Sequence, residues 1–257
     1  MKHKHYLPAL ALGLSICTGL GTAFAEQPAA ETNRQIMSSK NYTLRYSSGK
    51  NQWTVMENGG TRAVIYSYNG KFYNRTVFSD GNYYHMEQGD KGIVATLLPA
   101  SELDNPALDP AENWRSNVND LALPQALLIL DWDNPFNRRP TSWERPTYRD
   151  SGTQTIAKQT YDIDTYVGNV RTAAGTVAGQ VLYRLGYQGG VLKLVEINYL
   201  QDGVETPGRQ YMINELTAGA PGNMFGYKQV NLYAAGLGDM DDLLERPAVI
   251  GKIGGNT

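Results

Sequence analysis

Cysteine and histidine are almost absent from this chain. Of 257 residues one is cysteine and three are histidine, and only His85 lies beyond the first 25 residues. Cysteine nucleophiles, thiolate metal sites, iron–sulfur clusters and disulfides are therefore excluded from the rest of the chain. A Ser-His-Asp triad or a zinc site would depend on His85 alone. We expect no metal, no cofactor and no enzymatic activity, and we expect His85 to be a hydrogen-bonded residue of a sheet.

Basic clusters and membrane-spanning segments are also missing. The formal net charge is −2 and no cluster of basic residues occurs, which argues against nucleic acid as a partner. An apolar stretch, Leu7–Leu20, follows two lysines and precedes the A-x-A cleavage site Ala23-Phe24-Ala25. It is too short and wrongly flanked for a stable membrane span. We predict a signal peptide at residues 1–25, cleaved after Ala25, that exports the protein to the periplasm, with secretion as the alternative.

Turn-forming dipeptides, in contrast, are abundant. Between Ser48 and Asp90 one occurs about every ten residues, and short runs rich in Tyr, Phe, Val and Ile separate them. Asn-Gly and Asp-Gly readily adopt the positive φ angles of two-residue hairpin turns. The spacing predicts an antiparallel meander over residues 41–98, in which Tyr42, Leu44 and Tyr46 share one face. The turns are Ser48-Gly49, Asn58-Gly59-Gly60, Asn69-Gly70, Asp80-Gly81 and Gly89-Asp90.

The pattern changes to a helical one over residues 101–139. Asp109 can cap a helix whose first turn contains Pro110. The apolar stripe of this helix would consist of Trp114, Val118 and Leu121, which follow at helical spacing. A second short helix, Gln125–Leu130, follows Pro124. The chain is therefore predicted to be mainly β with a helical insertion, an α+β protein.

The rest of the chain divides into a lead-in, a second set of strands and a tail. Residues 26–40 form a polar lead-in with a short helix around Arg34–Met37, and residues 41–233 form a single domain. Residues 168–179 are predicted to be a long flexible hairpin, and residues 234–257 a flexible, Gly-rich, acidic tail. The predicted strands after the insertion are Tyr148–Ile156, Lys158–Val167, Gln180–Tyr187, Val191–Leu200 and Gln210–Leu216.

This order of sheet, insertion and sheet resembles the superfamily of the periplasmic outer-membrane lipoprotein carrier, the LolA-like proteins. The resemblance implies a curved, incompletely closed antiparallel sheet, or half-barrel, with a helical lid over its concave face. It also implies a lid-locking arginine, for which Arg45, Arg62 and Arg75 are all candidates. The segments that carry the resemblance are residues 66–78 with 81–87, residues 152–156 with 161–166, and residues 191–196 with 202–203.

The same resemblance implies a role in lipoprotein sorting or lipid transport in the cell envelope. Acyl chains of a lipid or an acylated protein would bind between lid and sheet, and an envelope protein is a possible partner. On this hypothesis Leu128→Glu weakens ligand retention with little loss of folding. The apolar stripes of these helices would fit a helix that is permanently packed on the sheet as well as they fit a mobile lid. The lid would present Trp114, Val118, Leu121, Leu127, Leu128 and Leu130, and the sheet Tyr42, Leu44, Tyr46, Trp53, Val55, Val64 and Tyr66.

Two other functions remain open. The chain has 17 tyrosines against 5 phenylalanines, and tyrosine suits a half-wet surface. A tyrosine-rich module that binds protein or carbohydrate would present several coplanar rings on the convex side of the sheet and no internal cavity. A carboxylate-dependent hydrolase would need two acids that face each other across a cleft. The candidate pairs are Asp162 with Asp164, two apart on a predicted strand, and Asp131 with Asp133.

Overall fold

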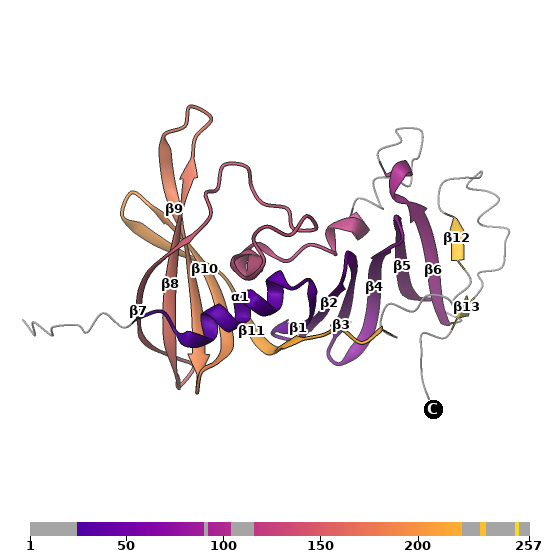
Figure 1. Ribbon diagram of the computed structural model, residues 1–257, viewed down its shortest axis with the longest axis horizontal. Helices are drawn as coiled ribbons and strands as arrows, with labels where there is room; N and C mark the ends of the chain where they lie inside the picture. Colours follow the sequence, from indigo (N-terminus) through magenta and orange to yellow (C-terminus); the bar gives the residue numbers. More distant parts are fainter. Residues whose placement is uncertain (1–24, 90–91, 104–115, 223–231, 235–249, 252–257) are drawn as a thin grey trace, which may run out of the picture.

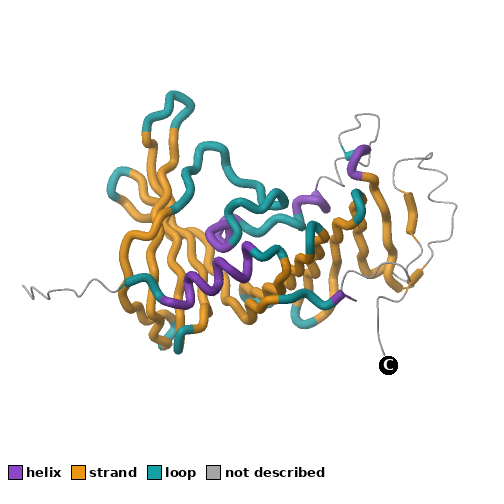
Figure 2. Tube along the Cα trace, in the orientation of Figure 1, coloured by secondary structure: helices purple, strands orange, loops and turns teal. Residues whose placement is uncertain are grey.

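One antiparallel sheet bends around the helices of the protein (Figure 1, Figure 2). The computed structural model describes residues 25–89, 92–103, 116–222, 232–234 and 250–251. Strands β1 to β11 form the sheet, which does not close on itself. The predicted mainly β class and the open antiparallel sheet are therefore confirmed.

The first half of the sheet is the predicted meander, in which β1 to β6 pair in chain order. Gly49, Gly59, Gly70 and Gly81 all have positive φ angles in the intervening turns, as the dipeptides predict. The strands are β1 (Asn41–Ser48), β2 (Asn51–Asn58), β3 (Thr61–Tyr68), β4 (Lys71–Ser79), β5 (Asn82–Gly89) and β6 (Gly92–Pro99).

The second half joins the first through β11, which pairs with β1. The order across the sheet is therefore β6-β5-β4-β3-β2-β1-β11-β10-β9-β8-β7. At its outer edge β6 also pairs with two short strands. They are β12 (Leu232–Ala234), which runs parallel to β6 at the end of the predicted domain, and β13 (Ile250–Gly251), which is antiparallel and lies in the predicted tail. The other strands are β7 (Thr147–Ile156), β8 (Gln159–Arg171), β9 (Val177–Gln188), β10 (Val191–Gln201) and β11 (Val204–Ala218).

The hairpin between β8 and β9 is shorter than predicted. Both strands extend into the segment expected to be flexible, so the connection covers only residues 172–176. Position 168, inside β8, holds a glycine because the backbone of a neighbouring segment passes too close for a side chain. A Cβ at this position would be 2.7 Å from the carbonyl oxygen of Glu144. The glycine therefore marks a close approach of two chain segments rather than a turn.

The turn between β7 and β8 uses two residues at positive φ that are not glycine, Ala157 (49°) and Lys158 (68°). Lys158 was predicted to lie in the strand. A left-handed conformation costs an L-residue about 1–2 kcal/mol. Lys158→Gly removes this cost but adds the entropy cost of ordering a glycine. We expect a net rise of about 0.5 kcal/mol in the free energy of unfolding, measured in urea. Lys193→Gly, inside β10, should lower it; a decrease for both variants would contradict the account.

The helices lie on the concave side of the sheet. The lead-in is a longer helix than predicted, α1 (Pro28–Ser38), which packs against β1, β10, β11 and the insertion. Asp109 and Trp114 of the first predicted insertion helix lie outside the described residues. Residues 116–119 are helical, and the second predicted helix is confirmed in position but is the 3₁₀ helix η2 (Gln125–Leu130). A further 3₁₀ turn, η1 (Ala100–Glu102), follows β6.

The main hydrophobic core lies between the concave face, α1 and the insertion. Side chains of η2 and its flanks fill the centre, and Leu121, Leu127 and Leu128 are fully buried there. On the opposite face a smaller cluster joins β2 to β5 through Met56, Val77 and related side chains. The described part of the insertion is thus continuous with the core of the sheet.

Candidate functional site

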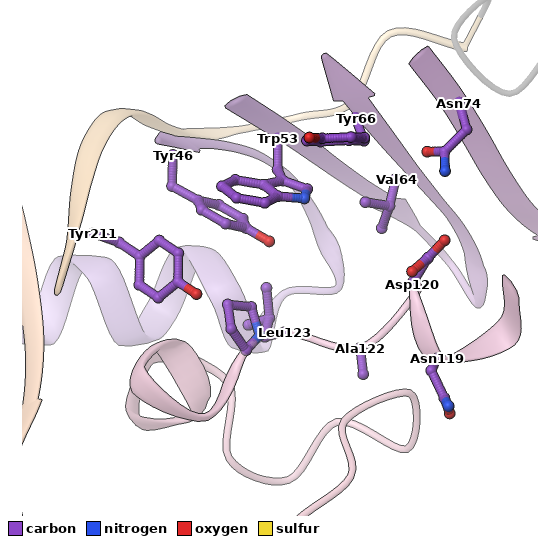
Figure 3. A pocket seen from close by; sticks show the side chains of 11 residues that line it. Tyr46, Trp53, Val64, Tyr66, Asn74, Asn119, Asp120, Ala122, Leu123 and Tyr211 are labelled. Carbon is purple, nitrogen blue, oxygen red and sulfur yellow. The ribbon is translucent and has the colours of Figure 1, made fainter. Parts of the chain in front are cut away.

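A cavity of about 420 Å³ lies where the insertion crosses the concave face (Figure 3). The sheet supplies one wall and residues 119–124, just before η2, supply the other. The sheet wall consists of Tyr46, Trp53, Val64, Tyr66, Asn74 and Tyr211, and the insertion wall of Asn119, Asp120, Ala122, Leu123 and Pro124.

The register of the meander creates the sheet wall. Tyr46 of β1 is paired with Trp53 of β2, which is paired with Tyr66 of β3, which is paired with Asn74 of β4. Residues directly opposite each other project from the same face of an antiparallel sheet. The pairing therefore aligns the four side chains in a row perpendicular to the strands.

The three rings of this row stack on one another, as Figure 3 shows. The ring centroids of Tyr46 and Trp53 are 5.1 Å apart with an angle of 14° between planes, and those of Trp53 and Tyr66 are 5.4 Å apart at 28°. Tyr211 meets Tyr46 edge-on at 5.4 Å. The faces of these rings are covered by neighbouring rings. A ligand in the cavity would therefore meet the edges of the rings and their polar tips.

The row runs from the interior to the surface. Tyr46 is 3% exposed, whereas Tyr73, which meets Tyr66 edge-on at 5.4 Å, is 61% exposed. Polar groups lie at the same end of the cavity, where Asp120 and Asn74 approach from opposite walls (Figure 3). Asp120 is exposed as a residue, but partial loss of hydration at its carboxyl raises its pKa. The cavity thus combines an aromatic interior with a polar mouth that carries one acid and, among the described lining residues, no base.

A buried polar network fixes the insertion beside the cavity. Arg62 of β3 is fully buried; its Nη1 atom donates to Glu57 Oε2 at 2.9 Å, and its Nη2 atom lies 3.5 Å from Asn137 Oδ1. The guanidinium also lies over the ring of Phe136, 5.4 Å from its centroid. Asn137 in turn accepts the backbone N–H of Leu123 at 2.9 Å. One arginine of the sheet therefore anchors residues at both ends of the segment that contains η2.

The network includes a second carboxylate, that of Asp131. Asn134 donates to Asp131 and to Glu57, each at 2.7 Å, and the Tyr42 hydroxyl lies 3.1 Å from both carboxylates. Lys40 pairs with Asp131 at 2.7 Å. Burial raises the pKa of Tyr42 well above its usual value, so the hydroxyl remains a donor. These contacts hold the residues after η2 against β1 to β3.

The arginines left open by the resemblance have different environments. Among the described contacts Arg62 is the one that joins sheet and insertion. Arg45 is exposed and pairs with Glu215 at 3.0 Å. Arg75 is buried with no partner for Nε and Nη2 among the described residues, and burial lowers its pKa to about 10.

The predicted cavity residues fall into three groups. Tyr46, Trp53, Val64 and Tyr66 line the cavity. Val118 is half-buried in the helical segment 116–119, and Trp114 lies outside the described residues. The remaining seven are buried in the main core: Tyr42, Leu44, Val55, Leu121, Leu127, Leu128 and Leu130.

The candidate acid pairs do not form a catalytic cleft. Asp164 is fully buried against α1, whereas Asp162 is only half-buried on the same strand. Asp131 belongs to the buried network, while the neighbouring Asp133 is exposed and pairs with Arg145 at 2.7 Å. His85 is buried, with Nδ1 3.0 Å from Thr76 Oγ1, and burial lowers its pKa. This confirms its expected place in the sheet.

The chain matches no protein-family model, and no curated protein matches it in sequence. None of the helices in the described ranges is long and apolar enough to cross a membrane. Within those same ranges, no three His, Cys, Asp or Glu side chains gather as metal ligands would. We base the functional proposal on the cavity beside the insertion because four of the residues predicted to bind a ligand line it.

Proposed function

We propose that this is an exported, non-enzymatic binding protein that carries or senses the acyl group of a lipid or an acylated protein. The single observation that supports this function is the cavity beneath the insertion. Its volume of about 420 Å³ lies within the roughly 300–1,000 Å³ of small-molecule sites. Each methylene that leaves water gains about 0.8 kcal/mol, so an acyl chain along the ring edges would supply the binding energy.

In this proposal the insertion is anchored at one end and open at the other. Arg62 would play the part of the lid-locking arginine, because it holds Asn137 against the sheet. Leu121, at the start of the anchored part, is fully buried, whereas Asn119 and Asp120 are exposed at the mouth. We therefore place ligand entry at residues 116–120. The polar head of the ligand would remain there, beside Asp120 and Asn74.

A surface-binding module is the alternative, and the stacking disfavours it. Carbohydrate recognition would use open ring faces, but Trp53 is covered on one side by Tyr46 and on the other by Tyr66. Among the described residues, the exposed tyrosines are Tyr68 on β3, Tyr73 on β4, Tyr148 on β7 and Tyr199 on β10, and only β3 and β4 of these strands are neighbours in the sheet. The internal cavity is also a feature that this alternative does not require.

The proposal is tested by filling the cavity. Asn74→Trp places a large ring beside Tyr66 on a strand that tolerates aromatics, so folding should be retained. Affinity for an N-lauroyl dipeptide amide, measured by calorimetry, should fall at least about tenfold, because 1.4 kcal/mol of lost contact already has that effect.

Gln154→Trp is the matched control, since Gln154 is exposed on β7 and does not line the cavity. This variant should bind as the unmodified protein does. Equal affinities of both variants and the unmodified protein for the probe would contradict an acyl site in this cavity.

A further inference from the structure

Asp164 is a fully buried carboxylate that forms no ion pair with any residue the structure describes. It lies on β8 beneath the first turn of α1, where it accepts the Gln27 backbone N–H at 2.9 Å and the Ser151 hydroxyl at 2.5 Å. Arg34 is already paired with Glu26 and Glu31. No lysine or arginine in the described residues forms an ion pair with Asp164. Two hydrogen bonds and the more distant charge of Arg34 stabilise this carboxylate, but it has no ion pair of its own. Because a buried charge is costly without a partner of opposite sign, it is suited to receive a cation.

The backbone beside this carboxylate is the predicted cleavage site. The Glu26 carboxylate is held by Arg34 Nη1 at 2.5 Å and by the Tyr166 hydroxyl. Ser151 Oγ lies 3.3 Å from the Ala25 carbonyl oxygen as well as 2.5 Å from Asp164. Asp164 accepts the backbone N–H of Gln27. Successive backbone nitrogens are about 3–4 Å apart, so the nitrogen of Glu26 is also close to the Asp164 carboxylate. Both sides of the Ala25–Glu26 peptide bond are thus held near Asp164.

We propose that Asp164 is the binding site for the α-ammonium group that forms at Glu26 when the chain is cleaved after Ala25. In that hydrolysis a processing peptidase adds the hydroxyl of water to the Ala25 carbonyl carbon and the hydrogen to the Glu26 nitrogen. An α-amino group with its usual pKa of about 7.7–8.0 is largely protonated at neutral pH. The cleavage therefore creates a cation beside the buried carboxylate that lacks one.

This pairing would link maturation to folding. α1, whose first turn lies beside Asp164, packs against β1, β10, β11 and η2, so the helix as a whole connects the two halves of the sheet through the core. An ammonium–Asp164 pair would fix that turn only after the leader is removed. The inference rests on the predicted cleavage site and is independent of the ligand in the cavity.

The test compares two forms of the chain, one that begins at Glu26 and one that keeps Ala23–Ala25. Three additional residues move the ammonium group by up to about 10 Å. Their presence should lower the thermal midpoint by roughly 5–10 °C, the shift that the loss of a buried charge partner produces in a chain of this length. In the Asp164→Asn background the same extension should have little effect. An equal shift in both backgrounds would overturn the proposal.

A second measurement does not require the variant to fold. The pKa of the Glu26 α-amino group, followed by ¹⁵N NMR in the unmodified mature protein, should lie above the usual value of about 8 because the ammonium form is paired. A pKa at or below that value would overturn the proposal. The mass of the exported protein should correspond to a start at Glu26, and a different start would also overturn it.

Discussion

Leu128→Glu is expected to unfold the protein rather than to empty its cavity. Leu128 is a residue of η2, is 0% exposed and belongs to the main hydrophobic core. Truncation of a buried leucine alone costs about 2–5 kcal/mol, and a buried glutamate adds the cost of an unpaired charge. Since a domain is stable by only about 5–15 kcal/mol, most of this stability would be lost. Circular dichroism and urea unfolding of the purified variant measure the effect.

Leu128→Met is the control, because a swap that conserves volume costs less than about 1.5 kcal/mol. The same position was predicted from sequence to tolerate glutamate as part of a mobile lid. A folded Leu128→Glu variant that has lost only ligand would support that hypothesis and contradict a fixed η2.

Arg62→Met is expected to lower the free energy of unfolding by about 3–5 kcal/mol, because it leaves buried carboxylates without their shared cation. Glu57 loses its ion pair at 2.9 Å, and Asp131, 3.8 Å from Arg62 Nη1, keeps only Lys40. The bond to Asn137 is lost too, so the insertion should loosen first. Urea unfolding gives the total loss, and hydrogen exchange of residues 121–137 shows whether opening begins there.

Two controls separate the buried charge from a general effect of losing arginine. Arg45→Met removes an exposed pair with Glu215 and should cost at most about 1 kcal/mol. The double variant Arg62→Met with Glu57→Leu removes both charges of the Arg62–Glu57 pair and should be more stable than Arg62→Met alone. If the double variant is less stable than the unmodified protein by the sum of the two single losses, Arg62 and Glu57 do not act as an ion pair.

The meander and half of the cavity wall follow from local sequence patterns. Turn dipeptides specify where each of β1 to β6 ends, and the period of two then places Tyr46, Trp53 and Tyr66 on one face. Four residues predicted to line a cavity do so for this reason. The sequence likewise predicts a short apolar helix at Gln125–Leu130 after Pro124, but apolar residues of this kind fit a lid and a core equally well.

The rest of the site depends on contacts between distant segments. Tyr211 reaches the row because β11 pairs with β1 across a β-bulge between Arg45 and Tyr46, and neither the pairing nor the bulge has a local signal. Asp120 lies between Val118 and Leu121 of the predicted apolar stripe, and that pattern indicates the apolar face of a helix but not a polar residue at a cavity mouth. The period of two places Arg62 on the face of Val64 and Tyr66, but no local pattern indicates its partner Asn137, which is 75 positions away. Buried networks of this kind are specified by tertiary packing and not by strand patterns.

The central claim, an acyl ligand in the cavity, is tested most directly by native mass spectrometry without detergent. The unmodified protein and Asn74→Trp would be purified from the exported fraction and then offered the N-lauroyl dipeptide amide. We predict adducts with the mass of lipids or acylated peptides, or uptake of the probe, in the unmodified protein, and neither in Asn74→Trp. An unmodified protein that carries no adduct and takes up no probe, or a variant that binds equally well, would contradict the claim.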